Sequence, residues 1–148
     1  MEIRRTDSTD PDFRTLVRLL DGDLAARDGE ENAFYSQFNK IDVIRHAVVI
    51  SENGRPYACG AMKEFDQDSV EIKRMYTSPE NRGEGLAKSV LHALENWAKD
   101  LGYRSCVLET GKRQPEAIAL YTSQGYTLVE NYGQYAGVEN SVCFRKDL

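Results

Sequence analysis

Residues 77–89 carry the feature that most constrains how this chain can fold, because a strand pattern ends there and a helix pattern begins. The segment reads Thr-Ser-Pro-Glu-Asn-Arg-Gly-Glu-Gly-Leu-Ala-Lys-Ser. Residues 70–77 have the character of a strand, and Pro79 cannot donate to a strand ladder. From Leu86 to Leu101 the apolar residues recur every three or four positions, which is typical of one helix face. The sequence therefore predicts a strand, a glycine-containing turn and a long amphipathic helix in succession.

The turn between the two patterns has the properties of an anion-binding site. Gly83 and Gly85 allow successive backbone N–H groups to converge, and the first N–H groups of a helix lack internal partners. The helix dipole adds positive charge at the same end, and Arg82 and Lys88 supply positive side chains. The segment is not a Walker phosphate loop, and Lys88 occupies the third glycine position of a dinucleotide fingerprint. A glycine-rich turn without a ligand is the alternative.

The rest of the chain predicts an α/β unit with a mixed sheet and helices on its faces. Asp10-Pro11 resembles a helix start, and Asn53-Gly54 is a strong hairpin signal. Gly102 and Gly125 are expected to end helices. We expect strands at residues 2–5, 43–51, 55–65, 70–77, 104–110, 126–130 and 141–146, and helices at residues 11–27, 33–38, 86–101 and 115–123.

Composition narrows the class of protein. The chain has 148 residues, a formal net charge of −5 and 41% hydrophobic residues, as expected for one domain (residues 1–148) rather than a disordered chain. No apolar run exceeds five residues and the start is charged, so we expect neither a membrane span nor a signal peptide. The negative charge argues against nucleic-acid binding. Cys59, Cys106 and Cys143 lack metal-ligand spacing, so we expect buried, reduced thiols in a cytoplasmic protein without a metal site.

Two motifs together resemble the GNAT superfamily of acetyl-CoA-dependent N-acetyltransferases. Residues 82–87, Arg-x-x-Gly-x-Ala, are similar to the signature Gln/Arg-x-x-Gly-x-Gly/Ala. Residues 114–126, Gln-x-x-Ala-x-x-Leu-Tyr followed by Gly-Tyr, are similar to its second segment, with Gln114 where asparagine is commoner. The resemblance covers residues 2–146 and implies an acyl-CoA N-acyltransferase fold: a central, twisted, mostly antiparallel sheet of six to seven strands with helices on both faces. It also suggests a homodimer, although no exposed apolar segment in the sequence indicates one.

The same resemblance implies where coenzyme A binds. Its diphosphate would lie on the glycine turn, and its pantetheine arm would pair like an extra strand with the strand ending near Thr77, beside a bulge. Gln114 would hold the coenzyme through its side-chain amide, and Glu84 is expected to face solvent and use only its backbone N–H. The implied coenzyme-binding residues are Met75, Tyr76, Thr77, Arg82, Gly83, Glu84, Gly85, Leu86, Ala87, Lys88, Gln114 and Tyr121.

Acyl transfer from a thioester to an amine needs a group that accepts the amine proton and a group that protonates the leaving thiolate. Tyr121 occupies the family's tyrosine position and is the implied acid. Glu71 is the expected base, because it lies eleven residues before Arg82, the same offset as the catalytic glutamate of histone-type lysine acetyltransferases. Glu109 and a water-mediated route are the alternatives.

Glu71 also has a purely structural interpretation. Lys73 or Arg74 could pair with it as an ordinary strand residue. Regular strand alternation would place Glu71, Lys73, Met75 and Thr77 on one face of the sheet.

The acceptor amine is expected opposite the coenzyme, beside the first two helices and the last hairpin. Acidic and aromatic groups there suit a cationic amine, although they are equally typical of helix ends and packing. The sequence does not identify the amine. A non-catalytic acyl-CoA-binding regulator and an interaction module without a ligand are the alternative functions. The candidate acceptor residues are Asp21, Asp23, Tyr35, Phe38, Glu109, Tyr132 and Tyr135.

Overall fold

A computed structural model describes residues 1–29 and 44–148, and it contains one seven-stranded sheet. The expected helix at residues 33–38, with Tyr35 and Phe38, lies outside the described residues. The strands are β1 (Glu2–Thr6), β2 (His46–Glu52), β3 (Arg55–Glu64), β4 (Ser69–Thr77), β5 (Ser105–Gly111), β6 (Thr127–Val129) and β7 (Ser141–Asp147). The helices are α1 (Pro11–Asp28), α3 (Leu86–Asp100) and α4 (Pro115–Ser123), with short 3₁₀ turns η2 (Pro79–Asn81) and η3 (Gly133–Tyr135).

The strand order confirms the expected mixed sheet. The strands lie in the order β1-β2-β3-β4-β5-β7-β6, and every neighbouring pair is antiparallel except β4 and β5. The β2–β3 hairpin turns at Asn53 and Gly54, both with positive φ (52° and 76°), as the dipeptide predicts. No sequence pattern predicted the short turns η2 and η3, which are only three residues long each.

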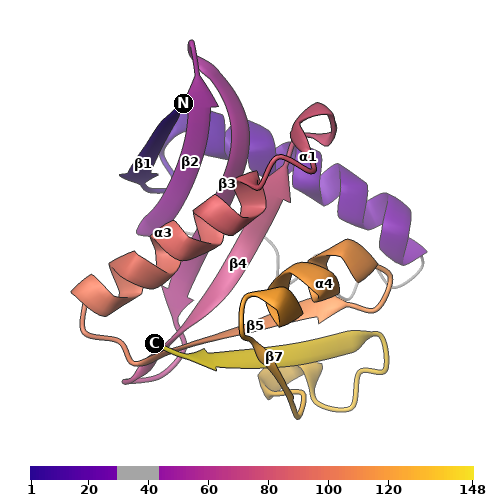
Figure 1. The fold of residues 1–148 in the computed structure, drawn as a ribbon. Helices are drawn as coiled ribbons and strands as arrows, with labels where there is room; N and C mark the ends of the chain where they lie inside the picture. The colour runs from indigo at the N-terminus through magenta and orange to yellow at the C-terminus, as the bar shows by residue number, and fades with distance from the viewer. Residues whose placement is uncertain (30–43) are drawn as a thin grey trace.

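Helices cover both faces of the sheet (Figure 1). On one face, α1 packs Phe13, Leu16 and Val17 against β2 and β3, which confirms the predicted apolar stripe. On the other face, α3 and α4 lie over a larger core that includes Val90 and Leu94.

Cys59, Cys106 and Cys143 are buried and free, and burial raises the pKa of the Cys143 thiol to about 11.

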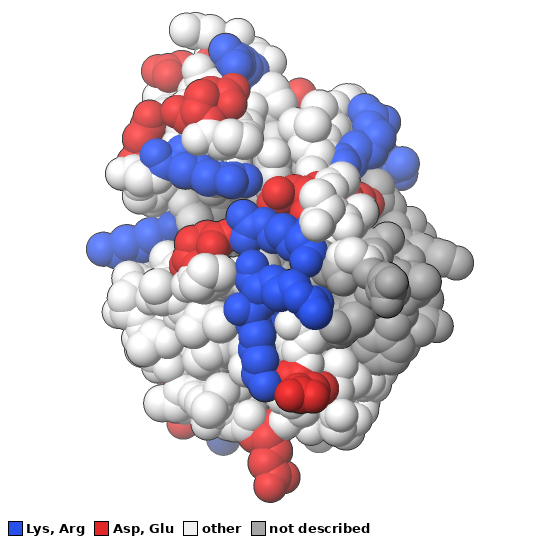
Figure 2. Space-filling view, turned by 90° about the vertical axis from the view of Figure 1, so that its right-hand side faces the viewer, with Lys and Arg blue, Asp and Glu red and all other residues white. Residues whose placement is uncertain are grey.

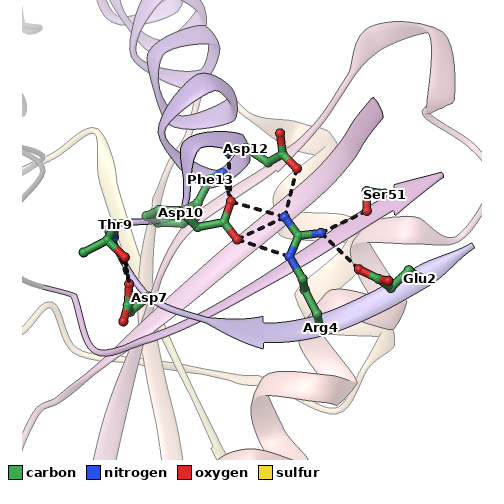
Figure 3. Close-up of polar contacts among 8 residues, drawn as sticks. All are labelled: Glu2, Arg4, Asp7, Thr9, Asp10, Asp12, Phe13 and Ser51. Atoms are coloured by element: carbon green, nitrogen blue, oxygen red, sulfur yellow. Dashed lines mark hydrogen bonds and ion pairs between the residues drawn. The ribbon is translucent and has the colours of Figure 1, made fainter. Parts of the chain in front are cut away.

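The start of α1 is fixed by a compact ion-pair cluster around Arg4 (Figure 3). The Asp10 side chain caps the helix by accepting hydrogen bonds from the N–H groups of Asp12 (2.8 Å) and Phe13 (3.4 Å). Both oxygens of Asp10 also accept from the Arg4 guanidinium, which contacts Asp12 as well. This cluster ties the start of α1 to β1.

A bulge interrupts β4 in front of the glycine turn. Arg74 has φ +60°, and the β3–β4 register shifts between Cys59 and Ala61. Gly60 lies at this point, where a Cβ would be 2.5 Å from Met75 Sδ, so a side chain does not fit. The bulge confirms the distortion that the family resemblance implied.

The same bulge makes the expected alternation wrong beyond Lys73. Val70 and Ile72 face the α3 core, so Glu71 and Lys73 face the opposite side. Because the bulge adds a residue, Met75 returns to the α3 side instead of sharing a face with Glu71.

Among the described residues, no helix is long and apolar enough to cross a bilayer.

Candidate active site

A cleft opens where the two parallel strands of the sheet separate. The β4–β5 ladder runs only from Ser69↔Ser105 to Ile72↔Leu108, although both strands continue beyond it. Residues 75–77 of β4 therefore face β5 without a ladder partner there. The resulting cavity has a volume of about 410 Å³ and extends from the glycine turn to two carboxylates, Glu71 and Glu109.

The glycine turn forms one end of this cleft. Gly83 and Gly85 have φ of 82° and 81°, in the left-handed region that glycine adopts readily, and α3 begins directly after them. The first N–H groups of α3 therefore lie at the cleft wall. Glu84 is exposed and does not line the cleft. All the other expected coenzyme residues line the cleft. They are Met75, Tyr76, Thr77, Arg82, Gly83, Gly85, Leu86, Ala87, Lys88, Gln114 and Tyr121.

Arg82 folds back against the strand that leads into the turn. Its Nε donates a hydrogen bond to the Thr77 carbonyl oxygen (3.0 Å), and its guanidinium lies 5.6 Å from the centre of the Tyr76 ring. Its Nη2 atom is also 3.9 Å from Asp23 Oδ2, so the turn is linked to the end of α1.

An ion-pair chain continues from Asp23 across the cleft. Asp23 pairs with Arg27 one helical turn later (3.4 Å), and Arg27 pairs with Glu116 at the start of α4. We call Arg82, Asp23, Arg27 and Glu116 the bridging chain, and all four line the cleft. Figure 2 shows the face on which α1 ends and α4 begins, with Lys and Arg side chains in a band down its centre and acidic side chains beside it.

Tyr121 of α4 reaches the same cleft from the α3 side of the sheet. The residue is 5% exposed, and its ring packs against Tyr126 and Phe144 with centroids 5.7 Å and 6.4 Å away. Burial, and secondly the charge of Glu109, raises the pKa of Tyr121 above its ordinary value. The hydroxyl therefore stays protonated near neutral pH, as a proton donor must.

Glu71 and Glu109 lie on the other side of the sheet, on adjacent strands. Glu71 is only 9% exposed; its Oε2 accepts a hydrogen bond from the Tyr132 hydroxyl (2.6 Å), and its Oε1 is 3.8 Å from Lys73 Nζ. Glu109 Oε2 accepts from the Ser141 hydroxyl (2.7 Å). Both carboxylates line the cleft, so the geometry keeps both as candidate bases.

The remaining acceptor candidates divide into two groups. Asp23 and Tyr135 line the cleft, whereas Asp21 and Tyr132 do not. Asp21 instead accepts a hydrogen bond from the buried Arg74 (3.2 Å), and burial raises the pKa of Asp21 although Arg74 opposes the change.

Several cleft residues were not expected from the sequence. Arg74 carries the bulge and lines the cleft, but a left-handed arginine has no reliable sequence signal. Arg27 and Glu116 come from different helices; only the Asp23–Arg27 spacing of four residues could have indicated an ion pair. Among residues 1–29 and 44–148, no group of three or more His, Cys, Asp or Glu side chains is placed to hold a metal ion.

The separated parallel strands and the glycine turn at the head of α3 define an acyl-CoA N-acyltransferase fold. Residues 10–126 match the model of the acetyltransferase (GNAT) family, and the chain belongs to this family. A Klebsiella pneumoniae protein described as a candidate acyl-CoA N-acyltransferase superposes with a TM-score of 0.82 at 30% identity, covering 99% of this chain and 97% of that one. A Thermoplasma acidophilum PaiA N-acetyltransferase solved with coenzyme A shares the fold at 16% identity, with a TM-score of 0.73 and coverage of 99% and 98%.

Sequence relatives agree with this family. The chain is 39% identical over 92 residues to the uncharacterized N-acetyltransferase YsnE of Bacillus subtilis; the match spans 61% of each chain. It is 31% identical over 102 residues to the IAA acetyltransferase of Azospirillum brasilense, across 68% of this chain and 67% of that one.

Proposed function

We propose that the protein is an N-acetyltransferase that moves an acetyl group from acetyl-CoA to a primary amine by direct attack in a ternary complex. The observation that carries the proposal is one continuous cleft with a glycine turn at one end, Tyr121 on its wall and two carboxylates at the other end. A regulator that only binds acyl-CoA would not need both an acid and a base in that cleft.

The backbone of the cleft suits the coenzyme. The N–H groups of residues 82–88 and the dipole of α3 favour the diphosphate, with Lys88 as an additional cation. Residues 75–77 can pair with the amide groups of the pantetheine arm as an added strand. Gln114, at the start of α4, offers a side-chain amide from the opposite wall.

Three proton transfers accompany the acetyl transfer. A lysine-like amine has a pKa of about 10.4 and arrives protonated, so it must lose a proton before attack. We assign this step to Glu71, directly or through one water. As the C–N bond forms and the C–S bond breaks, Tyr121 protonates the leaving thiolate, so free coenzyme A is released. The attacking nitrogen then loses its second proton, which restores the neutral Tyr121 hydroxyl and leaves the amide. Each positioned group typically contributes about 100- to 10,000-fold to the rate.

We also propose the domain organisation, the cellular compartment and the class of acceptor. Residues 1–148 would act as one domain, supported by the single continuous sheet. The three free, buried cysteines support work in the reducing cytoplasm. The net charge of −5 supports a small-molecule or peptide amine as the acceptor rather than a nucleic acid.

Two measurements test this function. At 100 times its Kd, acetyl-CoA should stabilise the protein by roughly 2.7 kcal/mol, whereas adenosine should not reproduce the effect at the same concentration. Thiol release from acetyl-CoA should then rise when a panel of primary amines is added. Binding without amine-dependent thiol release would favour the regulator, and no binding would favour the interaction module.

A further inference from the structure

Tyr132 stands behind Glu71 rather than in the cleft. It lies directly before η3, and its hydroxyl donates a 2.6 Å hydrogen bond to Glu71 Oε2. Glu71 lines the cleft, but Tyr132 does not. The phenol therefore contacts the carboxylate from outside the cleft.

The Tyr132 ring is held in place by its neighbours. It makes edge-on contacts with Phe65, 4.8 Å away between ring centroids, and with Tyr135, 6.0 Å away. It also packs against a small core formed by Tyr135 and Cys143. Because the ring is already ordered, the hydroxyl can hold the carboxylate at little additional cost in side-chain entropy.

The hydroxyl remains a donor over the whole working range of pH. Burial, and secondly the charge of Glu71, raises the pKa of Tyr132 well above its ordinary value. The other carboxylate oxygen, Oε1, is 3.8 Å from Lys73 Nζ, beyond hydrogen-bond distance. Of the contacts described for Glu71, the Tyr132 bond is thus the short, directional one.

We propose that Tyr132 is a positioning residue that fixes one oxygen of Glu71 and thereby aims the other oxygen at the acceptor nitrogen. This inference rests on the proposed role of Glu71 as the base. It gives the segment between β6 and β7 a part in catalysis without contact to the substrate.

The Glu71→Gln background gives a readout that a merely structural role would not move. A phenol that only supports the fold would matter equally in both backgrounds, whereas a positioning phenol matters only while residue 71 carries a carboxylate. The coupling between the two substitutions therefore separates the two roles.

The test compares Tyr132→Phe with Tyr103→Phe. Tyr103 is a matched control because its hydroxyl also donates to a glutamate, Glu64 (2.7 Å), on the exposed surface. We expect Tyr132→Phe to lower kcat about tenfold, because the carboxylate loses the short hydrogen bond that orients it. The KM for acetyl-CoA should stay within about twofold of the wild-type value, and Tyr103→Phe should behave as wild type.

The Glu71→Gln background separates the possible failures. If Tyr132 acts through Glu71, adding Tyr132→Phe to Glu71→Gln should cause no further loss. A wild-type kcat in Tyr132→Phe, or an equal loss in both backgrounds, would overturn the inference. If Glu71→Gln is itself as fast as wild type, the base assignment and this inference both fall while the acetyltransferase activity stands. A wild-type protein that releases no thiol with any amine would refute the proposed function and the inference that rests on it.

Discussion

The two ends of the cleft are built from different parts of the polypeptide. The end with the glycine turn, where we propose that coenzyme A binds, is lined by residues of one short segment, 82–88 without Glu84, at the head of α3. The end with the two carboxylates, the proposed acceptor end, is built from side chains of β4 and β5, which accept hydrogen bonds from Tyr132, directly before η3, and from Ser141 of β7. Among residues 82–88 the glycines should therefore be the most sensitive positions, whereas the acceptor end should respond to the loss of a single atom.

The largest effect is expected at Glu71. Glu71→Gln keeps the shape of the side chain but removes the group that accepts the amine proton, so kcat should fall about 1,000-fold. The loss should be greatest at low pH, where the amine is most protonated. Steady-state kinetics across pH will measure it, with Glu109→Gln as the matched variant on the neighbouring strand. A larger loss in Glu109→Gln would move the base to that residue.

Tyr121→Phe should have the next largest effect. The ring and its packing against Tyr126 and Phe144 are kept, but the thiolate loses its proton donor. We expect kcat to fall about 100-fold, with a smaller rise in the KM for acetyl-CoA. Turnover equal to that of the wild type would remove Tyr121 from the mechanism.

A glycine replacement tests the backbone end of the cleft. Gly85→Ala places a Cβ on a left-handed residue, which costs about 1–2 kcal/mol, so the Kd for acetyl-CoA should rise about tenfold if the turn shifts to relieve the strain. Gly102→Ala is the control, because Gly102 has φ +92° after α3 and does not line the cleft. Titration calorimetry should show weaker binding only for Gly85→Ala. Equal Kd values would mean that the turn does not bind the coenzyme.

The smallest effect is expected in the bridging chain. Asp23 holds Arg82 through a partly exposed contact of 3.9 Å, and such pairs contribute roughly 0.2–1 kcal/mol. Asp23→Asn should free Arg82 for the coenzyme phosphates and tighten acetyl-CoA binding up to about threefold at low salt. Asp100→Asn, which breaks the surface pair with Arg5 (2.7 Å), serves as the control. Weaker binding in Asp23→Asn would show that Asp23 supports the site instead.

The difference between the two ends also explains what could be predicted from the sequence. The strand, turn and helix around Gly83 and Gly85 were predicted because their determinants are local: a change of periodicity and two glycines. All expected coenzyme residues except Glu84 indeed meet at one cleft.

The acceptor end could not be derived in the same way. Its two carboxylates, Glu71 and Glu109, belong to separate strands that only the parallel pairing of β4 with β5 brings side by side. The Tyr132–Glu71 bond joins residues 61 positions apart in the sequence, so only the folded sheet brings them together.

A crystal structure of the protein with acetyl-CoA would show whether the glycine turn holds the coenzyme. We expect the diphosphate within hydrogen-bond distance of the backbone nitrogens of residues 82–88. We also expect the pantetheine arm between β4 and β5, with the thioester beside Tyr121. Acetyl-CoA bound elsewhere, or a glycine turn that stays empty at saturating acetyl-CoA, would refute the proposed binding mode.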